Sequence, residues 1–175
     1  IDDGDISYNL QIGDGVSADP AYNGLVGPDV SLVNLDDGDP SAPTSYSFDF
    51  GTDTSPVSAG YTQVTADTAY TAPSGFGWLS GTIRNADRAI GDDLVRDLNF
   101  TPEGTFVANL ANGTYRLSLT LGDQGPFAHD QMGIFAEGTQ LDVVTTAAGE
   151  MVTRPYQVTV ADGQLTLRLS DLGGA

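Results

Sequence analysis

Residues 105–121 read TFVANLANGTYRLSLTL, and this stretch decides the fold class. From Tyr115 to Leu121 apolar and polar residues alternate strictly, which is the pattern of a strand with one buried face. The run before it ends at Asn112-Gly113, the strongest two-residue hairpin signal in the chain. The stretch therefore predicts two strands joined by a tight turn, with the second strand central in its sheet and buried on one side.

Comparable apolar runs recur along most of the chain at intervals of about 10 residues, a spacing typical of β-sandwiches. A second tight hairpin signal lies at Asp162-Gly163, and the only candidate helix, Asp87–Leu94, is interrupted by Gly91. We therefore expect an all-β, antiparallel β-sandwich. The remaining predicted strands are Ser45–Phe50, Tyr61–Val64, Trp78–Arg84, Gln131–Phe135, Thr139–Thr145, Thr153–Val160 and Leu165–Leu169.

The first 39 residues have a different organisation. Ile6–Ile12 alternates apolar and polar residues, Val30–Leu35 is a second strand-like run, and residues 14–27 between them are rich in Gly, Asp, Pro and Asn. We divide the chain into residues 1–39 with one pair of strands, a linker at 40–44, and a β-sandwich module at 45–175.

The charge of the chain narrows the classes of partner. Asp and Glu number 24 against 6 Lys and Arg, which gives a formal net charge of −18. Such a surface repels nucleic acid and anionic lipid, and no apolar run is long enough to span a membrane. The sequence therefore predicts no nucleic-acid partner and no membrane insertion. The absence of cysteine excludes disulfides, thiol catalysis and cysteine-type zinc sites.

The acidic residues gather in short Asp/Gly clusters, such as Asp36, Asp37 and Asp39 at the end of the first part. Carboxylates on tight turns are the ligands that Ca²⁺ prefers, so these three residues are candidates for an ion that stiffens the junction. A solvated acidic linker explains the same residues. For the chain as a whole, adaptation to a saline habitat competes with calcium binding as the cause of the acid excess.

The stretch GDISYNLQIGDGVSADPAYNGLVGPDVSLVNLDDGD, residues 4–39, carries one resemblance. Its tyrosine-containing strand, long SADPAYNGL loop and DVSLVNLDD strand resemble the C-terminal part of the Calx-beta-like repeats of very large bacterial surface and secreted proteins. The resemblance implies that residues 1–39 are one partial unit of this kind.

A second resemblance rests on FDFGTDTSPVSAGYTQVTADTAY (48–70), GFGW (75–78), TFVANLANGTYRLSLTLGD (105–123), TTAAGE (145–150) and TRPYQVTVADGQLTLRLSDLGG (153–174). These segments resemble the galactose-binding-like jelly-roll modules found beside agarases and rhamnogalacturonan acetylesterases and in giant bacterial surface proteins. The resemblance implies a jelly-roll sandwich that binds glycans or serves as architecture, and no catalytic residue carries over. By analogy with related jelly rolls, it implies a structural Ca²⁺ at Asp49, Asp53 and Asp171.

Catalytic residues are hard to find in this sequence. No G-x-S-x-G motif occurs, and His129, the only histidine, would have to serve any Ser-His-Asp site. Glu137 and Glu150 each lie beside a glycine in a predicted turn, which is typical of solvated residues rather than of a glycosidase acid pair. We therefore expect no enzyme.

Glycan sites combine an aromatic ring with polar side chains that bind hydroxyl groups. The loop with Phe127, His129, Asp130 and Gln131 has this composition and is the first candidate, and Tyr61 and Tyr70 lie near other loops. Arg88 belongs to a group with Arg84 and Arg96, which suits either pairing with nearby Asp87, Asp92, Asp93 and Asp97 or a patch for an anionic glycan.

Two functions remain open. The first is a non-catalytic, calcium-stabilised module of a large extracellular or cell-surface bacterial protein, which binds a polysaccharide or a cell-surface glycan. The second is a structural subunit of a fibre or matrix. The resembling modules usually continue with one more apolar strand, so in this second hypothesis a neighbouring copy completes the sandwich, with Ile6–Ile12 as the donated strand.

Overall fold

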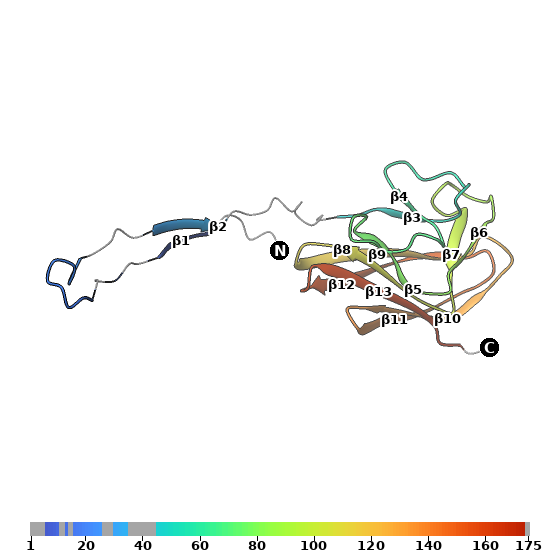
Figure 1. The fold of residues 1–175 in the computed structure, drawn as a ribbon. Helices are drawn as coiled ribbons and strands as arrows, with labels where there is room; N and C mark the ends of the chain where they lie inside the picture. The colour runs from blue at the N-terminus through green and yellow to red at the C-terminus, as the bar shows by residue number, and fades with distance from the viewer. Residues whose placement is uncertain (1–5, 11–12, 14–15, 26–29, 35–44, 174–175) are drawn as a thin grey trace. The chain divides into compact units, whose positions relative to one another are not determined.

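A computed structural model describes residues 6–10, 13, 16–25, 30–34 and 45–173, and every regular element in these ranges is a β-strand (Figure 1). In this described part, no helix is long and apolar enough to cross a membrane. The chain divides into two compact units, residues 1–41 and 42–175. The expected all-β class is confirmed.

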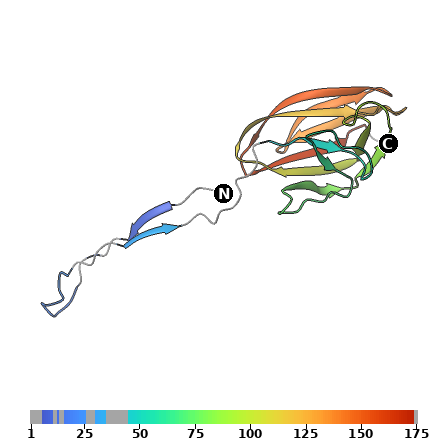
Figure 2. The same cartoon turned by 90° about the horizontal axis from the view of Figure 1, so that it is seen from above.

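The first unit contains one antiparallel pair, β1 (Ile6–Leu10) and β2 (Val30–Asn34), which run side by side (Figure 2). Strand β1 already pairs with β2 of the same chain, and its donation to a neighbouring copy stays a prediction. The candidate ligands Asp36, Asp37 and Asp39 lie outside the described residues. The Calx-beta-like origin of this unit stays a prediction.

One layer of the second unit is a five-stranded antiparallel sheet with the strand order β11-β10-β13-β8-β5. Leu167 lies opposite both Phe106 and Ala136, so these side chains share one face of the sheet. The strands are β5 (Phe76–Gly81), β8 (Glu103–Asn109), β10 (His129–Ala136), β11 (Thr139–Thr146) and β13 (Gln164–Asp171).

The other layer consists of a long pair, β9 with β12, and a short pair, β3 with β4, while β6 pairs with β7. Strands β3 and β4 are parallel, which departs from the otherwise antiparallel arrangement. The bounds of these strands are β3 (Phe48–Phe50), β4 (Thr62–Val64), β6 (Arg84–Asp87), β7 (Asp97–Phe100), β9 (Gly113–Gly122) and β12 (Met151–Val160).

Two apolar clusters between the layers form the core. In one, Phe48 and Phe50 of β3 pack edge-on against Phe106 of β8, with ring centroids 5.2 and 5.1 Å apart. In the other, the apolar side of β9 and β12 packs against the buried Ile134, together with residues of β11 and β13. Leu169 contacts both clusters, so the two pairs cover the same face of the five-stranded sheet and the module is a β-sandwich.

Several local predictions are wrong. Neither Asn112-Gly113 nor Asp162-Gly163 closes a hairpin: β8 and β9 belong to different sheets, as do β12 and β13, so each turn carries the chain from one sheet to the other. Strand β9 is buried on one face as expected, but among the described strands it pairs with β12 alone and is not central. The candidate helix Asp87–Leu94 is instead the end of β6 and the loop to β7, a strand that the sequence did not indicate.

Candidate functional site

A buried ion pair organises one end of the module. The Asp123 side chain, which follows β9, has no solvent exposure, and it accepts hydrogen bonds from Arg88 Nε at 2.9 Å and Nη2 at 2.7 Å. The backbone N–H of Gly125 donates a third, at 2.7 Å. The hydrogen bonds from Arg88 hold the pKa of Asp123 below its usual value. Asp123 is therefore a charged anchor rather than a proton donor.

The loop between β6 and β7 presents Arg88 to this carboxylate. The backbone N–H of Arg88 donates to the carbonyl of Arg96. The Arg96 side chain in turn forms a two-point ion pair with Asp87, in which Arg96 Nη2 lies 2.9 Å from Asp87 Oδ2. Ala89 next to it has a φ of 52°, which is uncommon for a residue with a side chain. The tight loop therefore fixes the guanidinium over Asp123.

Glycine is required where this loop meets the one after β9. A Cβ at Gly125 would lie 2.8 Å from Arg88 Nε and 3.0 Å from Asp123 Oδ1. Both groups are held by their mutual hydrogen bonds, so they have little freedom to move aside. The absence of a side chain at this position therefore allows the close approach.

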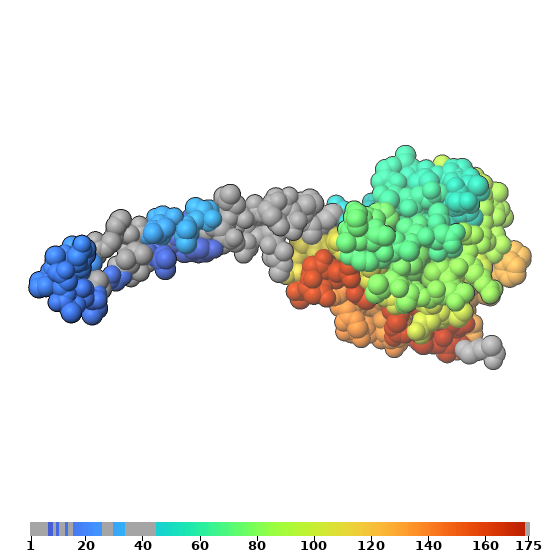
Figure 3. All heavy atoms as spheres, in the orientation of Figure 1, coloured from blue at the N-terminus to red at the C-terminus, as the bar shows by residue number. Residues whose placement is uncertain are grey.

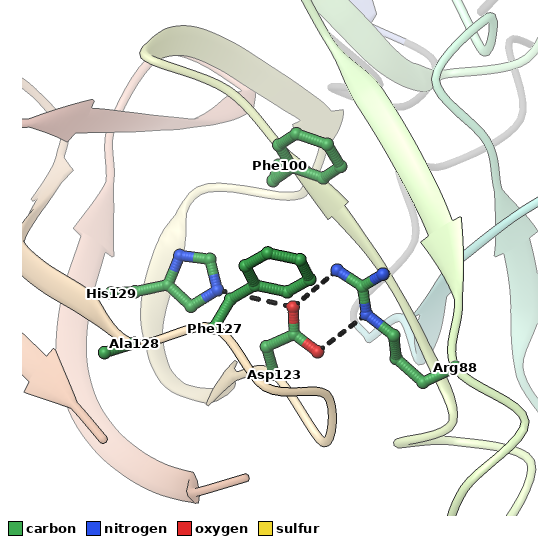
Figure 4. Close-up of a pocket in the computed structure, with 6 residues that line it drawn as sticks. All are labelled: Arg88, Phe100, Asp123, Phe127, Ala128 and His129. Carbon is green, nitrogen blue, oxygen red and sulfur yellow. Dashed lines mark hydrogen bonds and ion pairs between the residues drawn. The ribbon is translucent and has the colours of Figure 1, made fainter. Parts of the chain in front are cut away.

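Aromatic and imidazole groups complete the pocket (Figure 4). The guanidinium carbon of Arg88 lies 4.8 Å from the ring centre of Phe127, which is 52% exposed, and Phe100 lies at the end of β7. His129 Nε2 is 3.5 Å from Asp123 Oδ2, beyond the usual hydrogen-bond distance. These side chains, together with Ala128, line a cavity of about 260 Å³.

A β-bulge places His129. This residue lies opposite Thr146 and Met132 lies opposite Val144, so β10 advances three residues while β11 advances two. The bulge lies between His129 and Met132 and contains Gln131, whose φ of 45° is unusual for a non-glycine residue. Bulges of this kind redirect neighbouring side chains and are common beside functional sites.

The pocket offers groups that can bind a ligand. Its described lining contains no hydroxyl or thiol side chain. The exposed Phe127 ring suits the C–H face of a sugar, and Arg88 retains N–H groups that Asp123 does not use. The volume lies at the small end of ligand pockets and suits one or two sugar rings better than a large ligand.

The structure brings together three of the seven predicted ligand residues, namely Arg88, Phe127 and His129. Asp130 and Gln131 follow in β10 but do not line the cavity, and the N–H of Gln131 donates to Thr145. Tyr61 lies in the turn before β4, and the Tyr70 hydroxyl donates to Asn109 Oδ1. That any of these residues binds a ligand stays a prediction.

Sequence reasoning missed Asp123 and Phe100. The expectation that Arg88 pairs with an acid of its own segment is wrong, because its partner lies 35 residues later. The expectation was correct for Arg96 and Asp87. Asp123 is a single acid directly after a strand, and only the pairing of distant loops reveals its role. His129 begins β10 rather than lying in a loop, and its side chain is mostly buried.

The predicted calcium ligands are spread over the module. Asp49 is buried in β3, Asp53 is exposed in the turn after it, and Asp171 ends β13, where it accepts a hydrogen bond from the Gly173 N–H. Within the described ranges no group of three or more His, Cys, Asp or Glu side chains is placed to hold a metal ion. The set Asp49, Asp53 and Asp171 is therefore not assembled.

The two glutamates that we expected to be solvated are held by backbone groups. The Glu137 carboxylate accepts a hydrogen bond from the Thr166 N–H at 2.7 Å, and the Glu150 carboxylate accepts one from Ala147 at 2.8 Å. Both residues therefore stabilise turns of the fold, and neither lines the pocket.

Comparison with known proteins identifies relatives of this module. Beta-agarase A of Zobellia galactanivorans is 38% identical over 133 residues, which make up 73% of this chain and 24% of the agarase. The uncharacterized esterase YxiM of Bacillus subtilis is 27% identical over 135 residues, 74% of this chain and 33% of the esterase. The crystal structure of YxiM matches with a TM-score of 0.56 at 27% identity, over 74% of this chain and 36% of that one.

The chain thus spans about a quarter to a third of the length of these relatives. The family model described as beta-agarase/YXIM esterase-like, galactose-binding domain-like matches residues 46–172, the whole of the β-sandwich from Tyr46 to Leu172. This range includes the pocket and both core clusters. The chain therefore belongs to the beta-agarase/YXIM esterase-like, galactose-binding domain-like family.

Proposed function

We propose that the module binds a neutral, galactose-containing polysaccharide in the pocket of Arg88, Phe100, Asp123, Phe127 and His129. The observation that carries this proposal is the half-exposed Phe127 ring fixed beside a guanidinium, since an aromatic platform with adjacent donors suits a sugar ring. The relative named as a beta-agarase makes agarose the first polymer to test.

Charge favours a neutral glycan over an anionic one. Arg88 is the cation of the pocket, and Asp123 already neutralises it through two hydrogen bonds. A formal net charge of −18 on the chain adds long-range repulsion of acidic polymers. The alternative of an anionic-glycan patch at Arg88 is therefore the weaker one.

In this proposal the module is non-catalytic and anchors a larger bacterial protein to a glycan outside the cell. The relatives that it matches are three to four times longer than the aligned region, which is consistent with a module attached to other domains. A polysaccharide is too large to enter a cell, so its binding protein acts in the medium or on the cell surface.

The structural alternative, a self-associating fibre subunit, has one supporting observation. The pair β1–β2 exposes several large apolar side chains, among them Tyr8, Leu10, Leu32 and Val33. A two-stranded ladder with exposed apolar residues is a surface on which other chains can pack. This alternative concerns the first unit and leaves the pocket of the second unaffected.

Replacement of Phe127 tests the proposal. In affinity electrophoresis through gels containing agarose, we expect the wild type to be retarded and Phe127→Ala to bind about 10-fold more weakly, which corresponds to about 1.4 kcal/mol. Because Phe127 is half exposed, the thermal unfolding midpoint of Phe127→Ala should equal that of the wild type. Tyr22→Ala is the control, since Tyr22 is an exposed aromatic residue of the first unit and does not line the pocket.

Two results would overturn the proposal. One is equal retardation of the wild type and Phe127→Ala, which would place binding elsewhere on the module. The other is retardation by polygalacturonate and none by agarose or other neutral galactans, which would favour the anionic-glycan alternative.

A further inference from the structure

Buried oxygen atoms without a hydrogen-bond partner gather at one place in the module. In the described part of the chain, five buried side-chain atoms have no partner. Three of them are oxygens on β3 and β7, namely Oδ1 of Asp49, Asp97 and Asn99. A buried oxygen without a hydrogen-bond donor is costly, so two carboxylate oxygens and one amide oxygen in one region need an explanation.

Strands β3 and β7 lie next to each other at this place (Figure 1). Asn99 Nδ2 donates to the Gly51 carbonyl at 2.8 Å, and the Thr52 N–H donates to Asp97 Oδ2 at 3.2 Å. Asp97 and Asn99 are two residues apart on β7, so both side chains point to the same side, toward residues 51 and 52 after β3.

In each of the three side chains one terminal atom forms hydrogen bonds, and the other, Oδ1, has no hydrogen-bond partner. Asp49 Oδ2 accepts the Ser58 N–H at 2.7 Å, and Asp97 Oδ2 accepts Ser55 Oγ and the Thr52 N–H. The Asn99 amide cannot flip without placing its oxygen against the Gly51 carbonyl. The protein therefore fixes three oxygens in place without supplying a donor for any of them.

Both carboxylates are also buried. Asp49 is 2% exposed and Asp97 is 4% exposed, and the segment around β3 and β4, in cyan, forms the surface on this side (Figure 3). A Cβ at Gly51 would overlap the Asp97 carboxylate, so glycine is required there. Burial raises the pKa of the Asp49 carboxyl, and the negative charge of Asp97 raises it further.

We propose that Asp49, Asp97 and Asn99 bind one Ca²⁺ ion, with backbone carbonyls and water completing its coordination. Carboxylate and amide oxygens are the ligands that Ca²⁺ takes in proteins, and the ion would neutralise two buried charges at once. The site joins β3 to β7 and differs from the analogy with Asp53 and Asp171, because Asp53 is exposed and Asp171 lies at the end of β13.

The competing explanation is a proton on Asp49, which predicts that calcium changes neither the wild type nor Asp49→Asn, so the two explanations differ when calcium is present. If calcium fills the site, the variant loses the ion but is also relieved of a buried negative charge. With a chelator present, Asp49→Asn should therefore unfold at or above the temperature of the wild type. With calcium at about 1 mM, the range for extracellular modules, it should unfold below the wild type.

The experiment is calcium titration of the chelator-treated full chain by calorimetry, paired with thermal unfolding. We expect one site in the wild type and a rise of about 5 °C in the unfolding temperature with CaCl₂, both absent in Asp49→Asn. Asn99→Ala, which alters no charge, should bind calcium about 10-fold more weakly. Asp67→Asn removes an exposed carboxylate and should behave as the wild type.

Magnesium at the same concentration separates a site from general screening of an acidic protein. Mg²⁺ gives up its water reluctantly and prefers a rigid octahedral site, so its effect should be much smaller. No calorimetric site in the wild type, equal stabilisation by the two ions, or calcium stabilisation that survives in Asp49→Asn would each overturn the proposal.

Discussion

At the scale of single residues, two arginine–aspartate pairs have the same geometry and different surroundings. Arg88 binds Asp123, which is fully buried, and Arg96 binds Asp87, which is partly exposed. The value of an ion pair depends on what its loss leaves behind, and a buried unpaired carboxylate is far more costly than a solvated one. Since both arginines lie between β6 and β7, the two pairs form a matched test.

We expect Arg88→Met to lower the free energy of unfolding by about 3 kcal/mol at neutral pH. Arg96→Met, the control, should lower it much less, because water replaces the lost partner of Asp87. Urea denaturation of both variants and the wild type measures the difference. Equal losses would mean that Asp123 finds another partner or water when Arg88 is removed.

The same pair sets a pH dependence. Arg88 lowers the pKa of Asp123 in the folded state, so the stabilisation is present at neutral pH and is lost as the pH falls through the folded pKa. Without Arg88, burial favours the protonated form of Asp123, and the Gly125 N–H and His129 oppose it only in part. The deficit of Arg88→Met should therefore shrink as the pH falls toward the ordinary carboxyl range, whereas that of Arg96→Met should change little.

At the scale of elements, the tight turns show where sequence patterns were misleading. Asn112-Gly113 has the composition of a hairpin, but neither residue has a positive φ and the turn joins two sheets. The Gly163 N–H donates to Asn112 Oδ1, so this turn packs against the turn at Asp162-Gly163. The true two-residue hairpin is Glu137-Gly138 between β10 and β11, with φ values of 50° and 72°.

These backbone angles predict opposite effects for two glycines. Gly138→Ala should destabilise the module by about 1 kcal/mol, because alanine is strained at positive φ even where space is open. Gly113→Ala should change stability by less than about 0.5 kcal/mol, because its φ is not positive and a Cβ meets only ordinary contacts. Thermal unfolding of both variants measures the two stability losses. A larger loss for Gly113→Ala than for Gly138→Ala would support a hairpin at Asn112-Gly113 instead.

The sequence predicted most strands because alternation reports directly which face is buried, as in β9. It did not predict β7, since Asp97 and Asn99 are polar residues on a buried face. The residues of the pocket were likewise predictable only where the signal is local. The local composition near Phe127 and His129 was sufficient to nominate them, whereas Asp123 is meaningful only through Arg88, which belongs to another loop. Contacts between distant loops leave no periodic signal in the sequence.

At the scale of the whole molecule, the two units differ in how much core they have. Both apolar clusters lie between Tyr46 and Leu169, within the second unit. An isolated pair of strands is at best marginally stable in water, so β1–β2 contributes little to a cooperative transition. The stability of the chain should therefore reside in the module.

We expect residues 45–175 alone to unfold cooperatively within about 2 °C of the full chain, because they contain both apolar clusters of the described residues. Scanning calorimetry of both proteins measures this, and a much lower midpoint would show that the first unit stabilises the module.

Sedimentation of the full chain and of residues 45–175 tests the fibre alternative. If Tyr8, Leu10 and their neighbours drive association, the full chain forms oligomers while residues 45–175 stay monomeric. Association of both proteins alike would instead assign self-association to the β-sandwich, and monomers in both would leave glycan binding as the function that remains.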